Sequence, residues 1–240
     1  MPNSHRRVAW ITGAGSGMGR ASALRASRNG WSVGLTGRRQ LALEETARLV
    51  KQSGGEALVA PADVRDSAAL RAAYSAVHEW GSVSALVAAA GLNSRKRDWG
   101  SQEMTAFGDI VNTNLVATAA SIDLALPDLK ASRGTVVVVS SYSAWRFSPT
   151  AGVAYSASKV GLSSLCETLN SDEAANGVRA CHVCPGDVDS DFLALRPAVP
   201  DAEARRRMLS PDDVASAIQY VLDLPPHVRI NELVITPSWP

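Results

Sequence analysis

Short apolar runs rich in β-branched residues alternate with longer segments of helical periodicity along the whole 240-residue chain. Such alternation predicts a parallel sheet covered by helices. The strand segments are continuous apolar runs, such as the four valines at 136–139, rather than alternating apolar and polar residues. Burial of both sheet faces produces that pattern. The sequence therefore predicts one α/β domain over 1–240, with helices on both faces of a doubly wound, seven-stranded parallel sheet.

The boundaries follow from the apolar runs and from the glycines and prolines between them. Strands are expected at 7–12, 32–36, 56–60, 85–89, 134–140, 178–183 and 232–235. Helices are expected at 17–29, 40–53, 67–80, 103–130, 153–176 and 211–223. The segment 186–210 follows a strand and lacks a strand pattern, so we expect a loop or short-helix lid over a site.

Charge and composition exclude several classes of protein. The chain has 24 Lys and Arg against 23 Asp and Glu, whereas a nucleic acid–binding protein carries a basic face. No continuous apolar run reaches the roughly 18–20 residues that a membrane span needs. The first residues lack the apolar core of a signal peptide, so we expect a cytoplasmic protein without nucleic-acid or membrane partners.

Three cysteines are too few, and odd in number, for a disulfide framework. Cys181 and Cys184 form a C-x-x-C pattern, which permits redox chemistry or half of a zinc site; burial in a strand is the favoured interpretation. The four histidines show no metal-ligand spacing, so no metal is expected; they are His5, His78, His182 and His227.

A glycine-rich turn joins the first strand to the first helix. The residues at 12–19 are Thr-Gly-Ala-Gly-Ser-Gly-Met-Gly. Glycines let the backbone approach a pyrophosphate closely, and the helix N-terminus offers free N–H groups to it, as in Rossmann dinucleotide sites. The predicted cofactor-binding residues of this turn are Gly13, Ser16, Gly17, Met18 and Gly19.

The end of the second strand indicates which dinucleotide binds. An NAD site places a carboxylate there to hold the ribose 2′-OH, but this chain has Arg38 and Arg39 after Gly37. Arginine binds a phosphate in bidentate geometry, so NADP is predicted. The alternative is that the arginines begin a solvated helix, which suits Arg39 better than Arg38.

Tyr155 and Lys159 lie four residues apart, on one face of an expected helix. A phenol has a reference pKa of about 10, which is too high for acid–base work at neutral pH. A neighbouring ammonium group lowers a phenol pKa. Tyr155 would then exchange a proton with a substrate oxygen while a nicotinamide cofactor moves hydride.

Together, the glycine-rich turn and the Tyr-x-x-x-Lys pair resemble the short-chain dehydrogenase/reductase family, and the resemblance covers nearly the whole chain. Other segments are similar to further motifs of that family. They contain Asn114 in a central helix, Asp63 and Val64 after the third strand, Ala90 and Gly91 after the fourth, Ser141 after the fifth, and Pro185, Gly186, Val188 and Ser190 after the sixth.

The resemblance implies roles for these residues. Ser141 would hydrogen-bond the substrate oxygen, with Ser140 and Ser143 as alternatives, and Tyr155 would move the proton. Lys159 would lower the pKa of Tyr155 and bind the nicotinamide ribose. Asn114, with Asn112 as its rival, would hold a water that links Lys159 to solvent. Asp63 would meet the adenine, and the turn after Pro185 would meet the nicotinamide amide.

Two segments depart from the family pattern. Ala88-Ala89-Ala90-Gly91 replaces the usual Asn-Asn-Ala-Gly, so hydrogen bonds that tie the cofactor loop to the sheet are expected to be lost. The C-terminus lacks the Asp-Gly-Gly ending of many members and resembles the subgroup that acts on hydroxy acids and related small alcohols.

The family resemblance implies an NADP-dependent oxidoreductase that interconverts an alcohol and a carbonyl, as a homo-oligomer, either a tetramer, which is favoured, or a dimer. The alternative is a non-catalytic NADP(H)-binding sensor of the same fold. Residues in two loops are expected near the nicotinamide end, with Arg146 or Arg95 able to pair with a substrate carboxylate. These are Arg95, Lys96, Arg97, Trp99, Trp145, Arg146 and Phe147.

Overall fold

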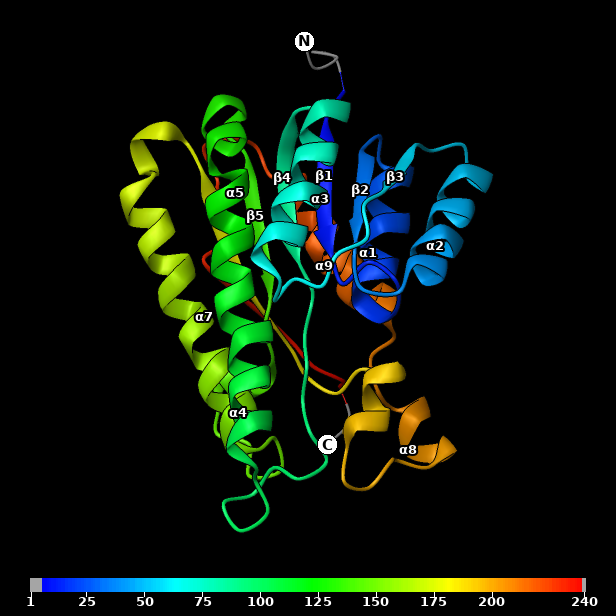
Figure 1. Cartoon of the computed structure of the whole chain (residues 1–240), viewed down its shortest axis with the longest axis vertical. Helices are drawn as coiled ribbons and strands as arrows, with labels where there is room; N and C mark the ends of the chain where they lie inside the picture. Colours follow the sequence, from blue (N-terminus) through cyan, green and yellow to red (C-terminus); the bar gives the residue numbers. More distant parts are fainter. Residues whose placement is uncertain (1–5, 239–240) are drawn as a thin grey trace.

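The computed structural model describes residues 6–238; the segments 1–5, which include His5, and 239–240 lie outside the described residues. All strand pairs are parallel, in the order β3-β2-β1-β4-β5-β6-β7 (Figure 1). The strands are β1 (Val8–Thr12), β2 (Ser32–Thr36), β3 (Ala57–Val59), β4 (Val83–Ala88), β5 (Thr135–Val139), β6 (Arg179–Pro185) and β7 (Glu232–Ile235). The doubly wound, seven-stranded sheet predicted from the sequence is confirmed.

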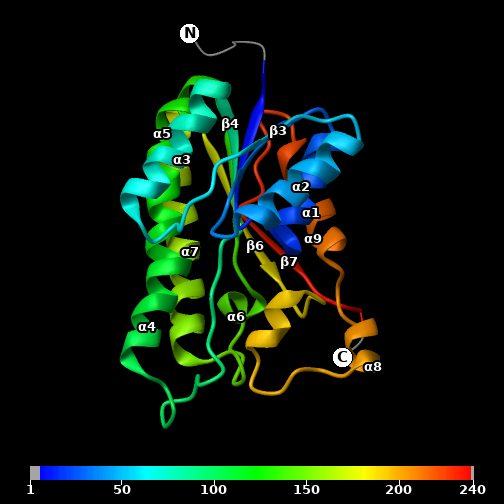
Figure 2. The same cartoon turned by 45° about the vertical axis from the view of Figure 1, so that its right-hand side comes forward.

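Helices cover both faces of this sheet, and Figure 2 shows the two layers edge-on. One layer contains α1 (Gly17–Arg28), α2 (Gln40–Gln52) and α9 (Pro211–Leu222). The other contains α3 (Ser67–Trp80), α4 (Met104–Val111), α5 (Ala117–Ser132) and α7 (Val153–Asp172). Each layer has its own core of buried aliphatic side chains against the sheet, which explains why the strands are apolar on both faces.

The structure adds detail where the sequence pattern was ambiguous. The helix expected at 103–130 contains a π-helical turn, Asn112–Val116, between α4 and α5. A short helix, α6 (Tyr142–Trp145), follows β5 and was not predicted. The helix expected at 153–176 ends at Asp172, before a 3₁₀ turn. The segment 186–210 contains a 3₁₀ helix, η3 (Asp191–Leu195), and a short helix, α8 (Ala202–Arg206).

The continuous helix Met104–Ser132 is long and apolar enough, by length and composition, to cross a membrane. It contains no long continuous apolar run, because polar residues such as Asp109, Asn112 and Asn114 interrupt it. Its α5 half packs against β4 and α3, where a core helix of a doubly wound domain lies. A core helix of this kind meets the same criteria of length and apolarity.

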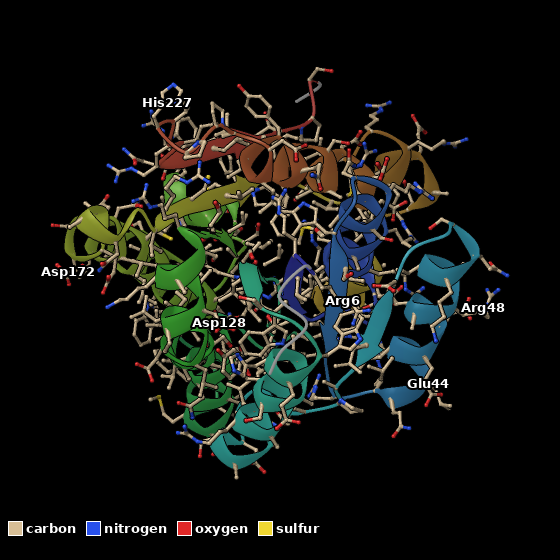
Figure 3. All side chains as sticks on the ribbon, turned by 90° about the horizontal axis from the view of Figure 1, so that it is seen from above. Arg6, Glu44, Arg48, Asp128, Asp172 and His227 are labelled. Carbon is tan, nitrogen blue, oxygen red and sulfur yellow. The ribbon has the colours of Figure 1, made fainter. Side chains whose placement is uncertain are left out.

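Charged side chains are sorted by position, as the view from above shows (Figure 3). Glu44, Arg48 and Asp172 are exposed at the rim of the molecule. Asp128 on α5 is instead buried, and its carboxylate accepts hydrogen bonds from the Val83 backbone N–H at 3.2 Å and pairs with His78 Nδ1 at 2.8 Å. This carboxylate therefore ties α5 to the start of β4.

The glycine-rich turn allows α1 to begin directly against β1. A Cβ on Gly19 would lie 2.3 Å from the Gly13 carbonyl oxygen, and one on Gly13, where φ is +67°, would lie 2.6 Å from the Ala89 oxygen. Both neighbouring atoms are backbone, so neither can give way. These two glycines set the separation between the turn, the helix and β4.

We expect Gly19→Ala to lower the free energy of unfolding by about 3 kcal/mol, because the new methyl group overpacks the turn. The matched control is Gly108→Ala in α4, where a Cβ meets no atom within 4 Å. That variant should gain about 0.5–1 kcal/mol from helix propensity. Urea unfolding measures both; equal effects would contradict the packing argument.

Candidate functional site

A cleft of about 1360 Å³ opens at the carboxyl ends of the strands. It lies where β1 has β2 on one side and β4 on the other, the point at which the strand order reverses. Ligands bind at this point in open α/β sheets. Every residue predicted from sequence as catalytic or cofactor-binding lines the cleft, with the exception of Asn114, which is buried behind it.

The glycine-rich turn forms one end of the cleft. Gly17 has φ of +51°, and a Cβ there would have only the Ser190 Cβ, at 3.6 Å, within contact range. Its backbone therefore faces open space that a pyrophosphate can occupy. The turn is anchored to the next loop, because the Ala90 backbone N–H donates to Thr12 Oγ1 at 3.3 Å.

Two arginines follow β2, and their environments differ. Arg39 Nη2 donates to Ser16 Oγ at 3.2 Å, which ties the start of α2 to the glycine-rich turn. Arg38 lines the cleft, and no hydrogen bond or ion pair with the rest of residues 6–238 engages its guanidinium. A free guanidinium beside an open cleft suits an anionic group of a ligand. Because Arg38 has no carboxylate partner in the described chain, a purely structural role for it is disfavoured.

Asp63 and Val64 line the cleft next to these arginines. The Asp63 carboxylate accepts hydrogen bonds from Arg65 Nη2 at 2.8 Å and from the Arg65 backbone N–H at 3.0 Å. Arg65 lowers the pKa of Asp63 through these bonds, so this side chain is a carboxylate. It is already neutralised by Arg65, and so it opposes an anion at Arg38 only weakly.

The turn after β6 crosses the cleft beside the glycine-rich turn. Pro185 ends the strand, the Gly186 backbone N–H donates to the Ile235 oxygen at 2.8 Å, and Val188 bridges to Leu209. Ser190 begins the 3₁₀ helix η3. These bonds hold the start of the 186–210 segment against the sheet, where a nicotinamide ring would lie.

Tyr155 projects from the first turns of α7 into the other end of the cleft. Ser141 caps α6, and it lies close enough to Tyr155 for its side chain to lower the pKa of the phenol. Ser143 Oγ donates to Ser141 Oγ at 3.1 Å, whereas Ser140 Oγ donates to the Lys159 main-chain oxygen. Among the three candidate serines, the geometry therefore brings Ser141 to the phenol.

Burial raises the pKa of Tyr155, and the Ser141 hydrogen bond and the charges of Arg97 and Arg196 oppose that rise. The sequence spacing predicted Lys159 as the cation that lowers this pKa. In the structure Lys159 Nζ lies 5.7 Å from the centroid of the Tyr155 ring. Arg97 and Arg196, from distant loops, are cations that the spacing did not indicate as lowering this pKa.

Lys159 is 4% exposed, and burial lowers its pKa to about 8. Its ammonium group donates to the Val139 oxygen at 2.8 Å, at the end of β5. Cys184 raises the Lys159 pKa slightly against this trend. The lysine thus titrates close to neutral pH, one helical turn from Tyr155.

Asn114 lies in the π-helical turn, a feature that often marks functional sites. Its Oδ1 accepts from the Leu92 N–H at 2.7 Å, and its Nδ2 donates to the Leu92 oxygen and to Ser158 Oγ, both at 3.0 Å. A Cβ on Gly91 would lie 3.7 Å from Asn114 Oδ1 and 4.0 Å from Lys159 Nζ. Asn112, the rival in the sequence, is exposed on the far side of the turn.

Three lining residues had no sequence signal. Thr113 lines the cleft, and its Oγ1 is buried without a hydrogen-bond partner in the part of the chain described. Arg196 and Asp187 form an ion pair at the mouth of the cleft. Both lie in the 186–210 segment, whose conformation no residue pattern specifies.

Of the loop residues expected near the nicotinamide end, Arg97 and Trp145 line the cleft. Arg146 instead stacks on Trp145, with its guanidinium carbon 4.6 Å from the ring centroid. Arg95 Nε donates to the Ala194 oxygen on the exposed surface. Neither Arg95 nor Arg146 lines the cleft, where pairing with a substrate carboxylate was expected.

The cysteines are buried, and burial raises the pKa of Cys181 and Cys184 to about 12. Side chains three residues apart on a strand point to opposite faces, so these two thiols do not form a redox pair. Cys184 instead lies beside His182 and Glu232, and the potential metal-ligand atoms of the three residues lie within 4.8 Å of one another. The sequence pattern of cysteines and histidines gave no sign of Glu232, which comes from a different strand. His182 Nδ1 lies 3.1 Å from Glu232 Oε2, which accounts for the cluster as a polar contact between β6 and β7.

The residues present fit a dinucleotide. Gly17 leaves room for a pyrophosphate, and Arg38 is free for an anion. Comparison with known proteins agrees. Residues 7–198 match the family model described as short chain dehydrogenase.

Individual relatives cover the same range of the chain. The glycine betaine reductase ATRR of Emericella nidulans is 34% identical over 248 residues, covering 96% of this chain but 19% of that protein. An alcohol dehydrogenase from the archaeon Thermococcus sibiricus, complexed with 5-hydroxy-NADP, is 28% identical with a TM-score of 0.88 over 98% of each chain. The closed form of a serine dehydrogenase complexed with NADP+ is 28% identical, with a TM-score of 0.85 over 96% of this chain and 94% of that one.

The buried Lys159 ammonium costs stability, because its pKa in the folded chain, about 8, is below the model value of 10.5. We expect Lys159→Met to raise the free energy of unfolding at pH 7 by about 2 kcal/mol. Removal of the buried charge contributes about 3 kcal/mol, and loss of its hydrogen bond takes away about 1 kcal/mol. The folded state binds fewer protons than the unfolded state between pH 8 and 10.5. The gain should therefore be full below pH 8 and vanish as the pH rises to 10.5. Urea unfolding at pH 7 and pH 10 measures it, with the exposed Lys51→Met as control; a loss of stability at pH 7 would contradict the burial argument.

Proposed function

The chain belongs to the short-chain dehydrogenase family, and on that basis we propose that it interconverts a small alcohol and the corresponding carbonyl with NADP(H). One observation supports this proposal above the others. Ser141, Tyr155 and Lys159 converge on the same cleft whose opposite end is the glycine-rich turn. A substrate at the phenol therefore lies next to the reactive end of a dinucleotide that extends to that turn.

A bound nicotinamide cofactor supplies or accepts the hydride. Tyr155 gives a proton to the substrate oxygen during reduction and takes it during oxidation. Ser141, which lines the cleft beside Tyr155, contacts the same substrate oxygen and stabilises the negative charge that develops there. The two hydroxyls thus position the oxygen and exchange its proton.

Lys159 returns the proton to Tyr155. Its pKa of about 8 lies near the working pH, which favours exchange in both directions. Asn114 Oδ1 and Lys159 Nζ both lie within 4.0 Å of the position that a Cβ on Gly91 would take, and Asn114 binds the loop after β4, so we propose that it holds a water connecting Lys159 to solvent. The ammonium group also binds the nicotinamide ribose.

NADP is favoured over NAD at the adenosine end. The unpaired guanidinium of Arg38 suits a 2′-phosphate, and the nearest carboxylate, Asp63, is already held by Arg65. We place the adenine beside Asp63 and Val64, and the nicotinamide amide beside the turn from Pro185 to Ser190. The relatives solved with NADP+ and with 5-hydroxy-NADP are consistent with this preference.

The remaining proposals concern the molecule as a whole. The 186–210 segment acts as a lid over the substrate, since Arg196 and Phe192 within it line the cleft. The chain forms a homo-oligomer, most simply a tetramer, in the cytoplasm. Exposed apolar side chains on the outer helices support a contact between copies; they include Met104, Val116 and Val160.

We expect Tyr155→Phe to reduce kcat by about 10²–10⁴-fold, because the acid–base group is removed. NADPH affinity, measured by quenching of tryptophan fluorescence, should change less than about threefold, since the ring and its packing on Phe192 are retained. The assay is NADPH consumption with a panel of ketones and aldehydes. A wild-type protein that binds NADPH and turns over no member of the panel would instead favour the sensor interpretation.

Arg38→Ala should weaken NADPH binding about 100-fold and NADH binding less than about threefold, because a charge-assisted phosphate contact is lost. Arg39→Ala is the comparison, since Arg39 contacts Ser16 and should affect both cofactors alike. Equal losses for NADPH and NADH in Arg38→Ala would overturn the assignment of NADP.

A further inference from the structure

Arg97 is held rigidly at the substrate end of the cleft. Its guanidinium donates to three main-chain oxygens from separate segments: Ser94 at 2.7 Å, Thr150 at 3.1 Å, and Leu195. These bonds use three of its five N–H groups, so two remain. The side chain is half-buried and lines the cleft that also contains Tyr155.

The backbone of Arg97 packs closely against the start of α7. Gly152, at the start of α7, has φ of +91°, and a Cβ there would lie 2.5 Å from the Arg97 Cβ. The Val153 N–H of α7 donates to the Arg97 main-chain oxygen at 3.2 Å. The guanidinium is therefore preorganised beside the helix that carries Tyr155, and little entropy is lost when it binds a ligand.

The charge of Arg97 is not neutralised by the protein. Within residues 6–238, no carboxylate lies within ion-pair distance of it. Burial lowers the pKa of Arg97, and repulsion by the Arg196 guanidinium lowers it further. Arg196 itself pairs with Asp187. A half-buried cation without a counter-ion is costly, and an anion bound in the cleft removes that cost.

We propose that Arg97 binds a carboxylate of the substrate, so that this enzyme acts on a short hydroxy acid and the corresponding oxo acid. The inference rests on the proposed function. Arg97 and Tyr155 line the same cleft, so a carboxylate bound by Arg97 shares that cleft with the phenol. Arg196, which pairs with Asp187, also lines the cleft.

A structural clamp is the competing explanation, because Arg97 also joins the loops at 94, 150 and 195. The two explanations differ in what they predict for substrate charge. Loss of a clamp impairs every substrate alike, whereas loss of a counter-ion impairs the acid and spares its neutral analogue. Matched substrates that differ only in charge therefore separate them.

The experiment compares 2-hydroxybutyrate and 3-hydroxybutyrate with their methyl esters, as kcat/KM for reduction of NADP+. Wild type should prefer at least one acid over its ester by about 100-fold. Arg97→Gln should lower kcat/KM for that acid about 100-fold and change the value for the ester less than about threefold. The control Arg95→Gln, in the same loop and bound to the Ala194 oxygen outside the cleft, should change neither.

Equal losses on acid and ester in Arg97→Gln, or a wild type that prefers the esters, would overturn the carboxylate assignment. The wild-type ratio needs no variant, so it tests the inference even where Arg97→Gln does not fold. Turnover of neutral alcohols alone would overturn this inference and leave the proposed function standing. Absence of Tyr155-dependent turnover with every alcohol and carbonyl would instead contradict the proposed function.

Discussion

The contact between the Lys159 ammonium group and the Val139 oxygen joins α7 to the carboxyl end of β5 at 2.8 Å. A second bond runs between the same elements, because Ser140 Oγ donates to the Lys159 main-chain oxygen at 3.2 Å. Together they fix the rotation of α7 and therefore direct Tyr155, one turn earlier, into the cleft. Burying the ammonium lowers its pKa to about 8, so the fold gives up stability to hold a titratable group at the site.

The loop after β4 is fixed by a different set of polar groups. Ala88–Ala90 lack the amide side chains that related proteins place there, and the sequence analysis expected the loop to lose hydrogen bonds. The structure supplies two replacements: Thr12 binds the Ala90 N–H, and Asn114 binds both backbone groups of Leu92. Asn114 reaches Leu92 from a π-helical turn and also binds Ser158 on α7. The loop is thereby connected to the glycine-rich turn and to α7, and its own Asn93 adds a hydrogen bond from Nδ2 to the Ala151 oxygen at 3.1 Å.

The features that could be predicted from sequence are those fixed by local pattern. Strands buried on both faces are continuous apolar runs, and residues four apart on a helix share a face, so the sheet and the pair Tyr155 and Lys159 followed directly. Arg97 was expected near the nicotinamide end, but its joint action with Arg196 on Tyr155 could not be predicted, because the two arginines are 99 positions apart and meet only when the segment 186–210 folds over the cleft. The π-helical turn was also missed, since its residues continue an ordinary helical period.

The charges along the cleft suggest why these distant arginines matter. Of the four acidic side chains in the lining, Asp63 pairs with Arg65 and Asp187 pairs with Arg196, whereas Asp98 and Asp191 have no arginine partner among the described residues. The cleft-lining cations without a carboxylate partner in the described chain are Arg38 and Arg39 at one end, Arg97 at the other, and Lys159. The whole chain carries a net charge of only +1, so this concentration of positive charge is local. A low-dielectric cleft strengthens such fields, and a ligand with negative groups at both of its ends gains from each. An NADP phosphate and a substrate carboxylate, bound together, form such a pair.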